Sequence, residues 1–356
     1  MLTLYKIQRS KDVTVTINTT LQHLPNILVI HDGRKGHLNP SLAIAEMISE
    51  QHPFNTISFQ LPIQLNKKLV SILKKLSHFP QIFQIIGQIF FKFQPQGIEN
   101  TKLIVCSGMP NLIYAAYLSR KYHIPLLYSG GTRKFNTALI NWIVASVPEN
   151  NACTQIIVPV GPTLAQFSTI RNTLPLQEAS LLLGGATEEY PFNQQHISTM
   201  IENFTQFCQQ HHLQGNIVTS RRTAPFSENM QQWMTQQQLR LITPIQNIAV
   251  CDILQRSQYA FVTSDSDTML SEALHTGRTV ISVGLNYTTA SFFDPLIAQH
   301  YLQRKTCEDL HTAIELPSPL MRNAIAQPIL NALNPILKNS VLQNTAHSLH
   351  SIQHFA

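Results

Sequence analysis

The chain has 356 residues, of which 44% are hydrophobic and only 12% are charged, with a formal net charge of +6 and a pI near 9.1. This length is too great for one ordinary core and suits two domains, and the composition excludes an intrinsically disordered chain. The basic excess favours an anionic partner, for which nucleotide diphosphates, anionic lipids and nucleic acid all qualify.

The five cysteines are scattered, odd in number and never spaced C-x-x-C. This pattern argues against a disulfide framework and against a structural zinc site, and it favours a reducing cytosol. The polar segment Met1–Thr20 lacks the apolar stretch of a signal peptide, and no apolar run reaches the roughly 18 residues of a membrane span. We therefore expect a cytoplasmic protein whose contact with a membrane is at most peripheral.

Short apolar runs bounded by turn residues recur through the first half of the chain. Asn26–His31 reads as a fully buried strand, followed by a turn over Asp32–Asn39 and a helix over Pro40–Ser49, with Pro40 in its first turn. Each later run leads into a helical segment or a Gly/Pro turn, which indicates a parallel sheet covered by helices. These further strands are expected at Lys102–Cys106, Pro125–Tyr128 and Gln155–Val158.

The same alternation starts again after residue 180, so we predict two doubly wound, Rossmann-like units with a boundary near residues 170–178. The predicted divisions are an N-terminal extension (1–23), a first domain (24–172), a second domain (173–315) and C-terminal helices (316–356). Gly277 is expected to end a helix of the second unit. The strands expected there are Leu181–Leu183, Asn216–Thr219, Tyr259–Thr263 and Thr279–Val283, with helices over Asn193–Gln210 and Thr268–Thr276.

Ligands of an open parallel sheet bind beyond the carboxyl ends of its strands, which draws attention to the loops there. The first such loop holds two candidate proton acceptors, His37 and Asp32. Its glycines permit tight turns, and backbone N–H groups at the following helix start favour negative charge. A glycine-containing turn with solvated charges is the alternative. The remaining residues of this loop are Gly33, Arg34, Lys35 and Gly36.

Two loops of the second unit suit phosphate. Gly184-Gly185 would let the backbone approach a diphosphate, although a simple strand-to-helix turn explains the pair equally well. Ser220-Arg221-Arg222 places two guanidinium groups after a strand, where bidentate N–H donors match phosphate oxygens. A surface ion pair is the alternative for either arginine.

A fourth loop places hydroxyls at a helix start, where the helix dipole favours phosphate. Glu272, one turn into that helix, can accept hydrogen bonds from both ribose hydroxyls, although a capped helix would carry the same residues. Asp265-Ser266-Asp267 imitates a metal-binding D-x-D motif, but we expect no metal and no cofactor. The phosphate candidates here are Ser264, Asp265, Ser266, Thr268 and Ser271.

Four motifs in order along the chain resemble a family of glycosyltransferase-like proteins named after a plant mitochondrial-fission factor (elongated mitochondria). They are D-G-R-K-G-H (32–37), L-L-G-G (182–185), T-S-R-R-T (219–223) and S-E-A-L-x-T-G-R (271–278). G-H-x-x-P and S-E-A-x-x-x-G are more distantly similar to the peptidoglycan N-acetylglucosaminyltransferase, which implies that Glu272 holds the donor ribose. The resemblance departs at Pro40, where the family usually has glutamine, and at Gly131-Thr132-Arg133, where the family tends to have Asp-Pro-Arg.

The resemblance implies a GT-B fold, in which two Rossmann-like domains face each other across a cleft. It also implies transfer of a sugar from a nucleotide-sugar donor to a hydroxyl of a cell-surface glycan or lipid-linked acceptor, of the lipopolysaccharide type. The first domain would hold the acceptor and the second the donor, with no metal. The first domain shows no obvious nucleophilic carboxylate, which favours inversion at the anomeric carbon. Two alternatives stay open: a nucleotide-sugar epimerase or hydrolase of the same fold, and a non-enzymatic adaptor.

No acidic residue occurs between Glu50 and Glu99, whereas five lysines are interleaved with apolar side chains within residues 67–93. A basic amphipathic segment of this kind suits the anionic cytoplasmic face of an inner membrane. A pair of ordinary core-facing helices with lysines on the wet side is the alternative. A nucleic-acid partner is not expected, because no recognised binding motif is present.

Overall fold

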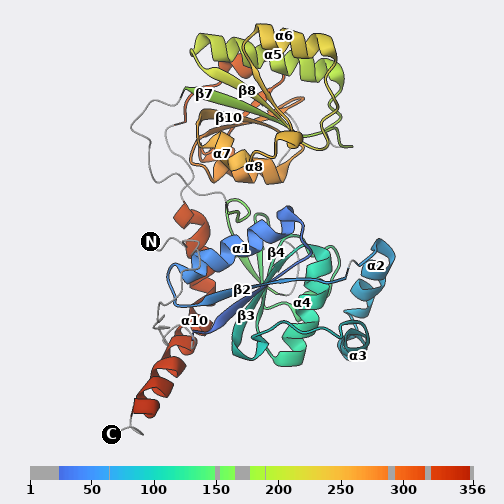
Figure 1. The fold of residues 1–356 in the computed structure, drawn as a ribbon, viewed down its shortest axis with the longest axis vertical. Helices are drawn as coiled ribbons and strands as arrows, with labels where there is room; N and C mark the ends of the chain where they lie inside the picture. Colours follow the sequence, from blue (N-terminus) through green and yellow to red (C-terminus); the bar gives the residue numbers. More distant parts are fainter. Residues whose placement is uncertain are drawn as a thin grey trace, which may run out of the picture.

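The computed structural model describes residues 24–63, 65–148, 153–164, 177–188, 190–287, 293–316 and 322–352, the last fifteen of these by backbone alone. The predicted extension 1–23 and most of the predicted boundary near 170–178 lie outside these residues. Two parallel six-stranded sheets, each covered by helices, lie one beyond the other (Figure 1). The predicted α/β class with two Rossmann-like domains is therefore confirmed.

The first sheet has the strand order β2-β1-β3-β4-β5-β6, with every neighbouring pair parallel. Its central strands are buried on both faces, which explains their continuous apolar sequences. The strands are β1 (Asn26–His31), β2 (Asn55–Gln60), β3 (Thr101–Ser107), β4 (Leu126–Ser129), β5 (Trp142–Ala145) and β6 (Thr154–Ile157). The helices around it are α1 (Lys35–Ser49), α2 (Lys67–Leu76), α3 (Pro80–Phe90) and α4 (Met109–Tyr122).

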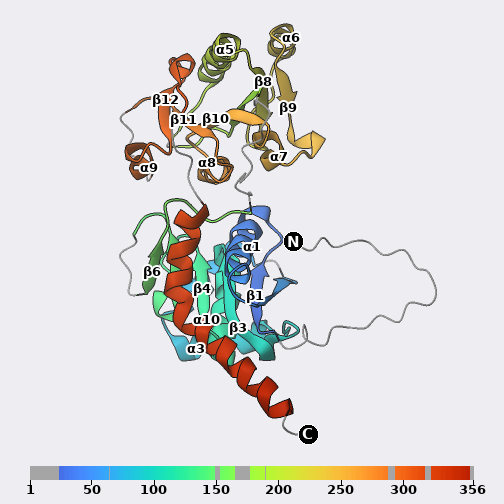
Figure 2. The same cartoon turned by 90° about the vertical axis from the view of Figure 1, so that its left-hand side faces the viewer.

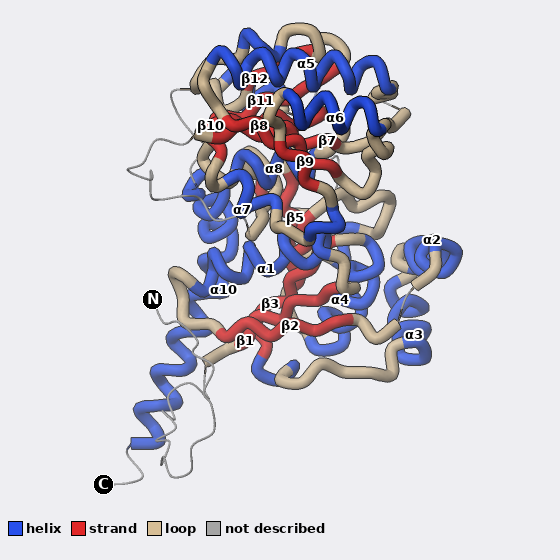
Figure 3. Tube along the Cα trace, turned by 45° about the horizontal axis from the view of Figure 1, so that its top comes forward, coloured by secondary structure: helices blue, strands red, loops and turns tan. Residues whose placement is uncertain are grey.

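The second sheet has the order β12-β11-β10-β7-β8-β9 and is also parallel throughout. Its strands are β7 (Glu178–Leu183), β8 (Gln214–Thr219), β9 (Arg240–Ile242), β10 (Ser257–Thr263), β11 (Thr279–Gly284) and β12 (Gln303–Thr306). Its helices are α5 (Gln194–Gln210), α6 (Glu228–Gln236), α7 (Val250–Leu254), α8 (Asp267–Leu274) and α9 (Asp294–Ala298). Helices α7 and α8 lie on the side of this sheet that faces the first domain (Figures 1 and 3).

The last helix, α10 (Arg322–Ile352), leaves the second domain and runs along the first (Figure 2). Its buried Leu333 and Leu337 belong to a hydrophobic cluster that also includes residues of α1, β1 and α8. Arg322 at its start donates a 2.8 Å hydrogen bond to Glu50 at the end of α1. The chain thus crosses between the domains twice, and one apolar cluster extends over both.

One predicted boundary is wrong. Helix α1 begins at Lys35 rather than at Pro40, so Pro40 lies inside the helix instead of in its first turn. The N–H groups of His37 and Leu38 both donate to the Arg34 carbonyl, which starts the helix early. Proline has no N–H to offer the carbonyl of Gly36, four residues back, so this turn of the helix lacks one hydrogen bond.

Each sheet has a point where successive strands depart in opposite directions, and ligands of doubly wound folds bind at such switch points. In the first sheet this point lies between β1 and β3. In the second it lies between β7 and β10. The four loops selected from the sequence follow β1, β7, β8 and β10, so they gather at these two places.

Candidate active site between the two domains

The first switch point holds a histidine–aspartate pair. His37, in the first turn of α1, has its Nδ1 3.0 Å from both carboxylate oxygens of Asp32, which follows β1. The Asp32 carboxylate also accepts a 3.2 Å hydrogen bond from the Arg34 backbone N–H. The His37 side chain is 25% exposed and that of Asp32 13%, so the imidazole can still be reached from outside. With Nδ1–H donating to the carboxylate, His37 has its Nε2 lone pair available for a proton.

The charge state of Asp32 follows from two opposed effects. Burial acts to raise the pKa of its carboxyl, but hydrogen bonds from His37 and the Arg34 backbone, with the charges of both side chains, outweigh burial. The pKa of Asp32 is therefore lower than its ordinary value. An ionised Asp32 orients the imidazole and stabilises it once it has taken up a proton.

Gly108, which follows β3, sits against the ring of His37. A Cβ at this position would lie 2.5 Å from His37 Nδ1, and the backbone has a φ of +83°, which favours glycine. The glycine lets the β3–α4 turn approach the imidazole from the side opposite β2. The pair at the first switch point is therefore confined by residues from two adjacent strand ends.

The second switch point holds a buried carboxylate. The side chain of Asp265, after β10, is fully buried and accepts a 2.7 Å hydrogen bond from Arg222 and a 3.0 Å bond from the Gly185 N–H. A Cβ on Gly184 would lie 2.1 Å from an Asp265 oxygen. The Gly184 N–H donates to Thr263 Oγ1 at 2.8 Å. Both glycine N–H groups and one arginine thus serve contacts within the domain.

Several other predicted phosphate ligands also serve internal contacts. The Ser220 hydroxyl donates to the Gly184 carbonyl at 3.1 Å, and the hydroxyls of Ser264 and Ser282 are 2.8 Å apart. Ser266 caps α8 by accepting from the Met269 N–H. Arg221 differs: its side chain is exposed, and within the described part of the chain no ion pair involves it.

A pocket of about 200 Å³ lies between the domains. It is smaller than the roughly 300–1,000 Å³ typical of small-molecule sites, so it suits part of a ligand such as one sugar or phosphate. Most of its lining residues are small or carry hydroxyl groups, and both of its acidic side chains come from α8. The first domain contributes Gly36, Asn39, Pro40, Ser129, Ser146, Gly161, Pro162 and Thr163, and α8 contributes Asp267, Thr268, Ser271 and Glu272.

Glu272 lies on the pocket wall opposite α1. Burial raises the pKa of its carboxyl above the ordinary value, and the positive charge of Lys35 at the start of α1 counteracts part of this rise. The carboxylate of Glu272 in the second domain therefore interacts electrostatically with the ammonium group of Lys35 in the first. An acidic group in this position can accept hydrogen bonds from a diol held between the domains.

The structure brings the predicted residues together only in part. Gly36, Thr268, Ser271 and Glu272 line the pocket, whereas His37 and Asp32 do not. Ser129, Ser146 and the segment 161–163 were not among the predicted residues. The rule of strand ends points to Ser129, which follows the predicted strand Pro125–Tyr128, but Ser146 follows β5, for which no strand was predicted.

Two findings concern metals and membranes. Across the described ranges, no three His, Cys, Asp or Glu side chains gather closely enough to hold a metal ion. Helices long and apolar enough to cross a bilayer are likewise absent from the described part of the chain.

Comparisons with known proteins place this geometry in context. A UDP-GlcNAc 2-epimerase from Methanocaldococcus jannaschii superposes with a TM-score of 0.50 at 12% identity, covering 87% of this chain and 99% of that one. The glycotransferase of kitacinnamycin gives 0.47 at 12% identity, covering 93% and 99%. Arabidopsis thaliana UGT89C1 complexed with UDP-L-rhamnose gives 0.44 at 12% identity, covering 91% and 98%. At these identities the likeness concerns the fold alone, and no curated protein matches the chain.

A family model described as mitochondrial fission ELM1 matches residues 163–330. Three of the four motifs that carry the predicted resemblance lie within this match, at 182–185, 219–223 and 271–278. The resemblance to the ELM1 family is therefore confirmed over residues 163–330, and the chain as a whole has the two Rossmann-like domains of the GT-B fold.

Proposed function

We propose that this protein transfers a sugar from a nucleotide-sugar donor to a hydroxyl group of a glycan or lipid-linked acceptor. The observation that carries the proposal is the meeting of two helix starts at one inter-domain pocket. Helix α1 lines the pocket with Gly36 and carries His37, the partner of Asp32, as the next residue, just outside the lining, and α8 lines the pocket with Glu272 from the second domain. A base on one side and a diol ligand on the other are the parts that glycosyl transfer requires.

The donor side of the proposal uses α8. Glu272 accepts from the ribose hydroxyls, and the hydroxyls of Thr268 and Ser271 meet the diphosphate near the helix start, where the dipole favours negative charge. Arg221, exposed and free of ion pairs among the described residues, is the guanidinium that offsets charge on the leaving diphosphate. Arg222 instead holds Asp265 and so fixes the loop that carries its neighbour.

The chemical step needs one proton acceptor. His37 Nε2 takes the proton of the acceptor hydroxyl as its oxygen attacks the anomeric carbon, and the bond from that carbon to the diphosphate oxygen breaks. The nucleoside diphosphate leaves with the bonding electrons, and the configuration at the anomeric carbon inverts. Asp32 stabilises the imidazolium that forms. Closure of the domains around both substrates would exclude water from the reaction.

We place the acceptor at the cytoplasmic face of an inner membrane, as a growing cell-envelope glycan of the lipopolysaccharide type. The neutral, hydroxyl-bearing first-domain wall of the pocket suits an uncharged sugar ring rather than a charged headgroup.

Thermal unfolding with UDP, GDP, ADP, TDP and CMP, each with and without chelator, tests the donor site. A ligand at 100 times its dissociation constant adds about 2.7 kcal/mol to the free energy of unfolding. We expect one base to stabilise selectively and the chelator to have no effect. If none of the nucleotides stabilises the protein, the fold serves as an adaptor and the proposed function is wrong.

Turnover assays distinguish sugar transfer from epimerisation and hydrolysis. They use sugar derivatives of the nucleotide that stabilises the protein. Transfer predicts that donor consumption needs an acceptor and that His37→Ala abolishes consumption while leaving nucleotide affinity within about twofold. Interconversion or hydrolysis of the donor without acceptor would instead support the epimerase or hydrolase.

A further inference from the structure

The surface of the first domain carries an apolar face that no described element covers. Six large hydrophobic side chains on and between α2 and α3 are each 45–60% exposed. A helix packed on a globular core normally turns polar residues outward, so this face has an unusual composition. The six residues are Ile72, Phe79, Ile82, Ile85, Ile89 and Phe90, here called the α2–α3 apolar face.

Helix α3 is apolar on both sides. Its inner side buries Phe83 and Gly87, and a Cβ on Gly87 would lie 2.3 Å from the ring of Tyr117 in α4. Its outer side presents Ile82, Ile85 and Ile89, spaced by three and four residues along one stripe. Pro80–Phe91 contains no charged residue at all. The inner side alone packs on the core, so the exposed isoleucines of the outer side are not needed to hold α3 in place.

The helix pair α2–α3, here called the hairpin, is held against the rest of the first domain, so the α2–α3 apolar face cannot turn inward. Phe83 packs edge-on against Phe135 with ring centroids 6.1 Å apart. Asn136 donates its backbone N–H to the Ser77 hydroxyl at 3.0 Å and its side-chain amide to the Ser77 carbonyl at 2.8 Å. Ser77 lies in the turn between α2 and α3, so the tip of the hairpin is tied to the domain. Both helices lie outside α4 at the edge of the molecule (Figures 1 and 3).

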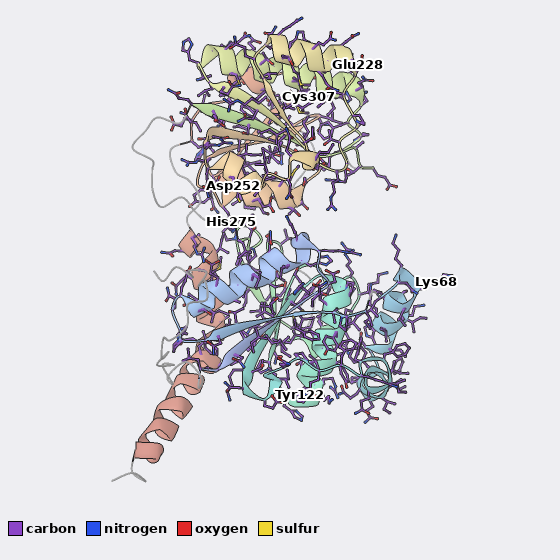
Figure 4. The ribbon with its side chains drawn as sticks, viewed as in Figure 1. Lys68, Tyr122, Glu228, Asp252, His275 and Cys307 are labelled. Atoms are coloured by element: carbon purple, nitrogen blue, oxygen red, sulfur yellow. The ribbon has the colours of Figure 1, made fainter. Side chains whose placement is uncertain are left out.

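The segment that carries the apolar face is positively charged and contains no acidic residue. Lys67, Lys68 and Lys75 of α2 and Lys92 after α3 are exposed, and no Asp or Glu occurs between Glu50 and Glu99. Figure 4 shows Lys68 pointing outward from α2, away from the body of the domain. An apolar stripe beside lysines matches a surface whose interior is apolar and whose headgroups are negative.

We propose that the α2–α3 apolar face docks on an anionic lipid bilayer, with α3 inserting between headgroups and the α2 lysines binding phosphates. A second copy of the chain fits less well, because two such faces would oppose lysine to lysine with no acid between them. This surface goes beyond the proposed transfer reaction and does not rest on it, since lipid binding can be measured without turnover. It is distinct from the pocket between the domains, which none of its residues lines.

The test is flotation of the full-length protein with vesicles of phosphatidylcholine, alone or mixed with phosphatidylglycerol. The wild-type protein should float with the mixed vesicles and not with phosphatidylcholine alone. Ile85→Gln/Ile89→Gln should weaken binding by about tenfold or more, because each isoleucine loses its burial in lipid. The matched control is Ile245→Gln/Ile314→Gln, which removes two exposed isoleucines of the second domain and should bind as wild type.

The lysines give an independent readout. Lys67→Gln/Lys68→Gln/Lys75→Gln should weaken binding by about fivefold per lysine and reduce its dependence on salt. Ile85→Trp should show a blue-shifted emission when mixed vesicles are added. Thermal melts monitored by circular dichroism establish that each variant is folded.

Absence of vesicle binding by the wild-type protein would overturn the proposal, and so would binding by Ile85→Gln/Ile89→Gln at wild-type strength. A wild-type dimer that this double variant converts to a monomer, with no vesicle binding, would also overturn it, by assigning the face to self-association. None of these outcomes bears on nucleotide stabilisation, so the surface and the transfer reaction fail separately.

Discussion

The guanidinium of Arg222 and the buried carboxylate of Asp265 form a 2.7 Å ion pair across the switch point of the second sheet. This pair ties the end of β8 to the end of β10, and the Gly185 N–H completes the network at 3.0 Å. Arg221, its neighbour in sequence, is exposed instead. Two adjacent arginines of the same motif therefore have different tasks.

Substituting the two arginines separately should show that Arg222 supports the stability of the fold and Arg221 the binding of the nucleotide. Arg222→Ala leaves a buried carboxylate without its charged partner, and we expect a loss of about 1–3 kcal/mol in the free energy of unfolding. Arg221→Ala should change it by less than about 0.5 kcal/mol. Urea denaturation measures both, and titration calorimetry with the stabilising nucleotide should show the larger affinity loss for Arg221→Ala. The reverse assignment would mean that Arg222 is the phosphate ligand.

Asp32 should contribute a stability that depends on pH. Because its folded-state pKa is lower than its unfolded-state value, the contribution is present above the unfolded pKa and is lost as pH falls through the folded pKa. Asp32→Asn should therefore be less stable than wild type at pH 7, and the difference should shrink as the pH drops below about 4. Melting curves recorded from about pH 3 to about pH 7 measure this difference in stability. Asp252→Asn, at an exposed position of α7, is the control. A constant difference for Asp32→Asn would contradict the ion pair with His37.

Glu272 should behave in the opposite sense. Its folded pKa is raised by burial, so its contribution to stability is fully present below the unfolded pKa and is lost as pH rises through the folded pKa. Glu272→Gln should therefore raise the melting temperature at neutral pH and reduce nucleotide affinity by about tenfold or more. Lys35→Met should lower the melting temperature at neutral pH, because it removes the charge that counteracts burial. Unchanged nucleotide affinity in Glu272→Gln would place the ribose elsewhere.

Two glycines near His37 should respond differently to an added methyl group. Gly108→Ala would place a Cβ 2.5 Å from the His37 ring at a φ of +83°, so it should destabilise the fold and displace the imidazole. Gly36→Ala lies inside α1, where the new Cβ would have nothing within 4 Å beyond its chain neighbours and the adjacent helix backbone, and it should stabilise the fold by about 0.5–1 kcal/mol. Denaturant unfolding compares them. Equal effects would show that the β3–α4 turn is free to move away from His37.

The sequence predicted the central strands well because parallel strands buried on both faces read as continuous apolar runs. Asn26–His31 was predicted with both ends correct. The sequence did not predict β2, β9 and β12, which lie at sheet edges or carry polar residues, as in Gln303–Thr306. It missed β5 as well, whose four residues are too few to show a period. The early start of α1 was missed because Gly36 and Pro40 are poor helix formers whose places are set by packing.

What the sequence by itself determined is the alternation of buried strands and helices along the chain, the two-domain α/β class and the loops that carry polar side chains after buried strands. It did so because burial and backbone hydrogen bonding impose a local period on apolar residues. Only the tertiary structure decided which strand ends adjoin, and with them which loops share a site. The ion pair of Asp265 joins residues 43 positions apart, and α10 returns to Glu50 over 272 positions. Strand order is fixed by packing between distant segments, and no local pattern in the chain encodes it.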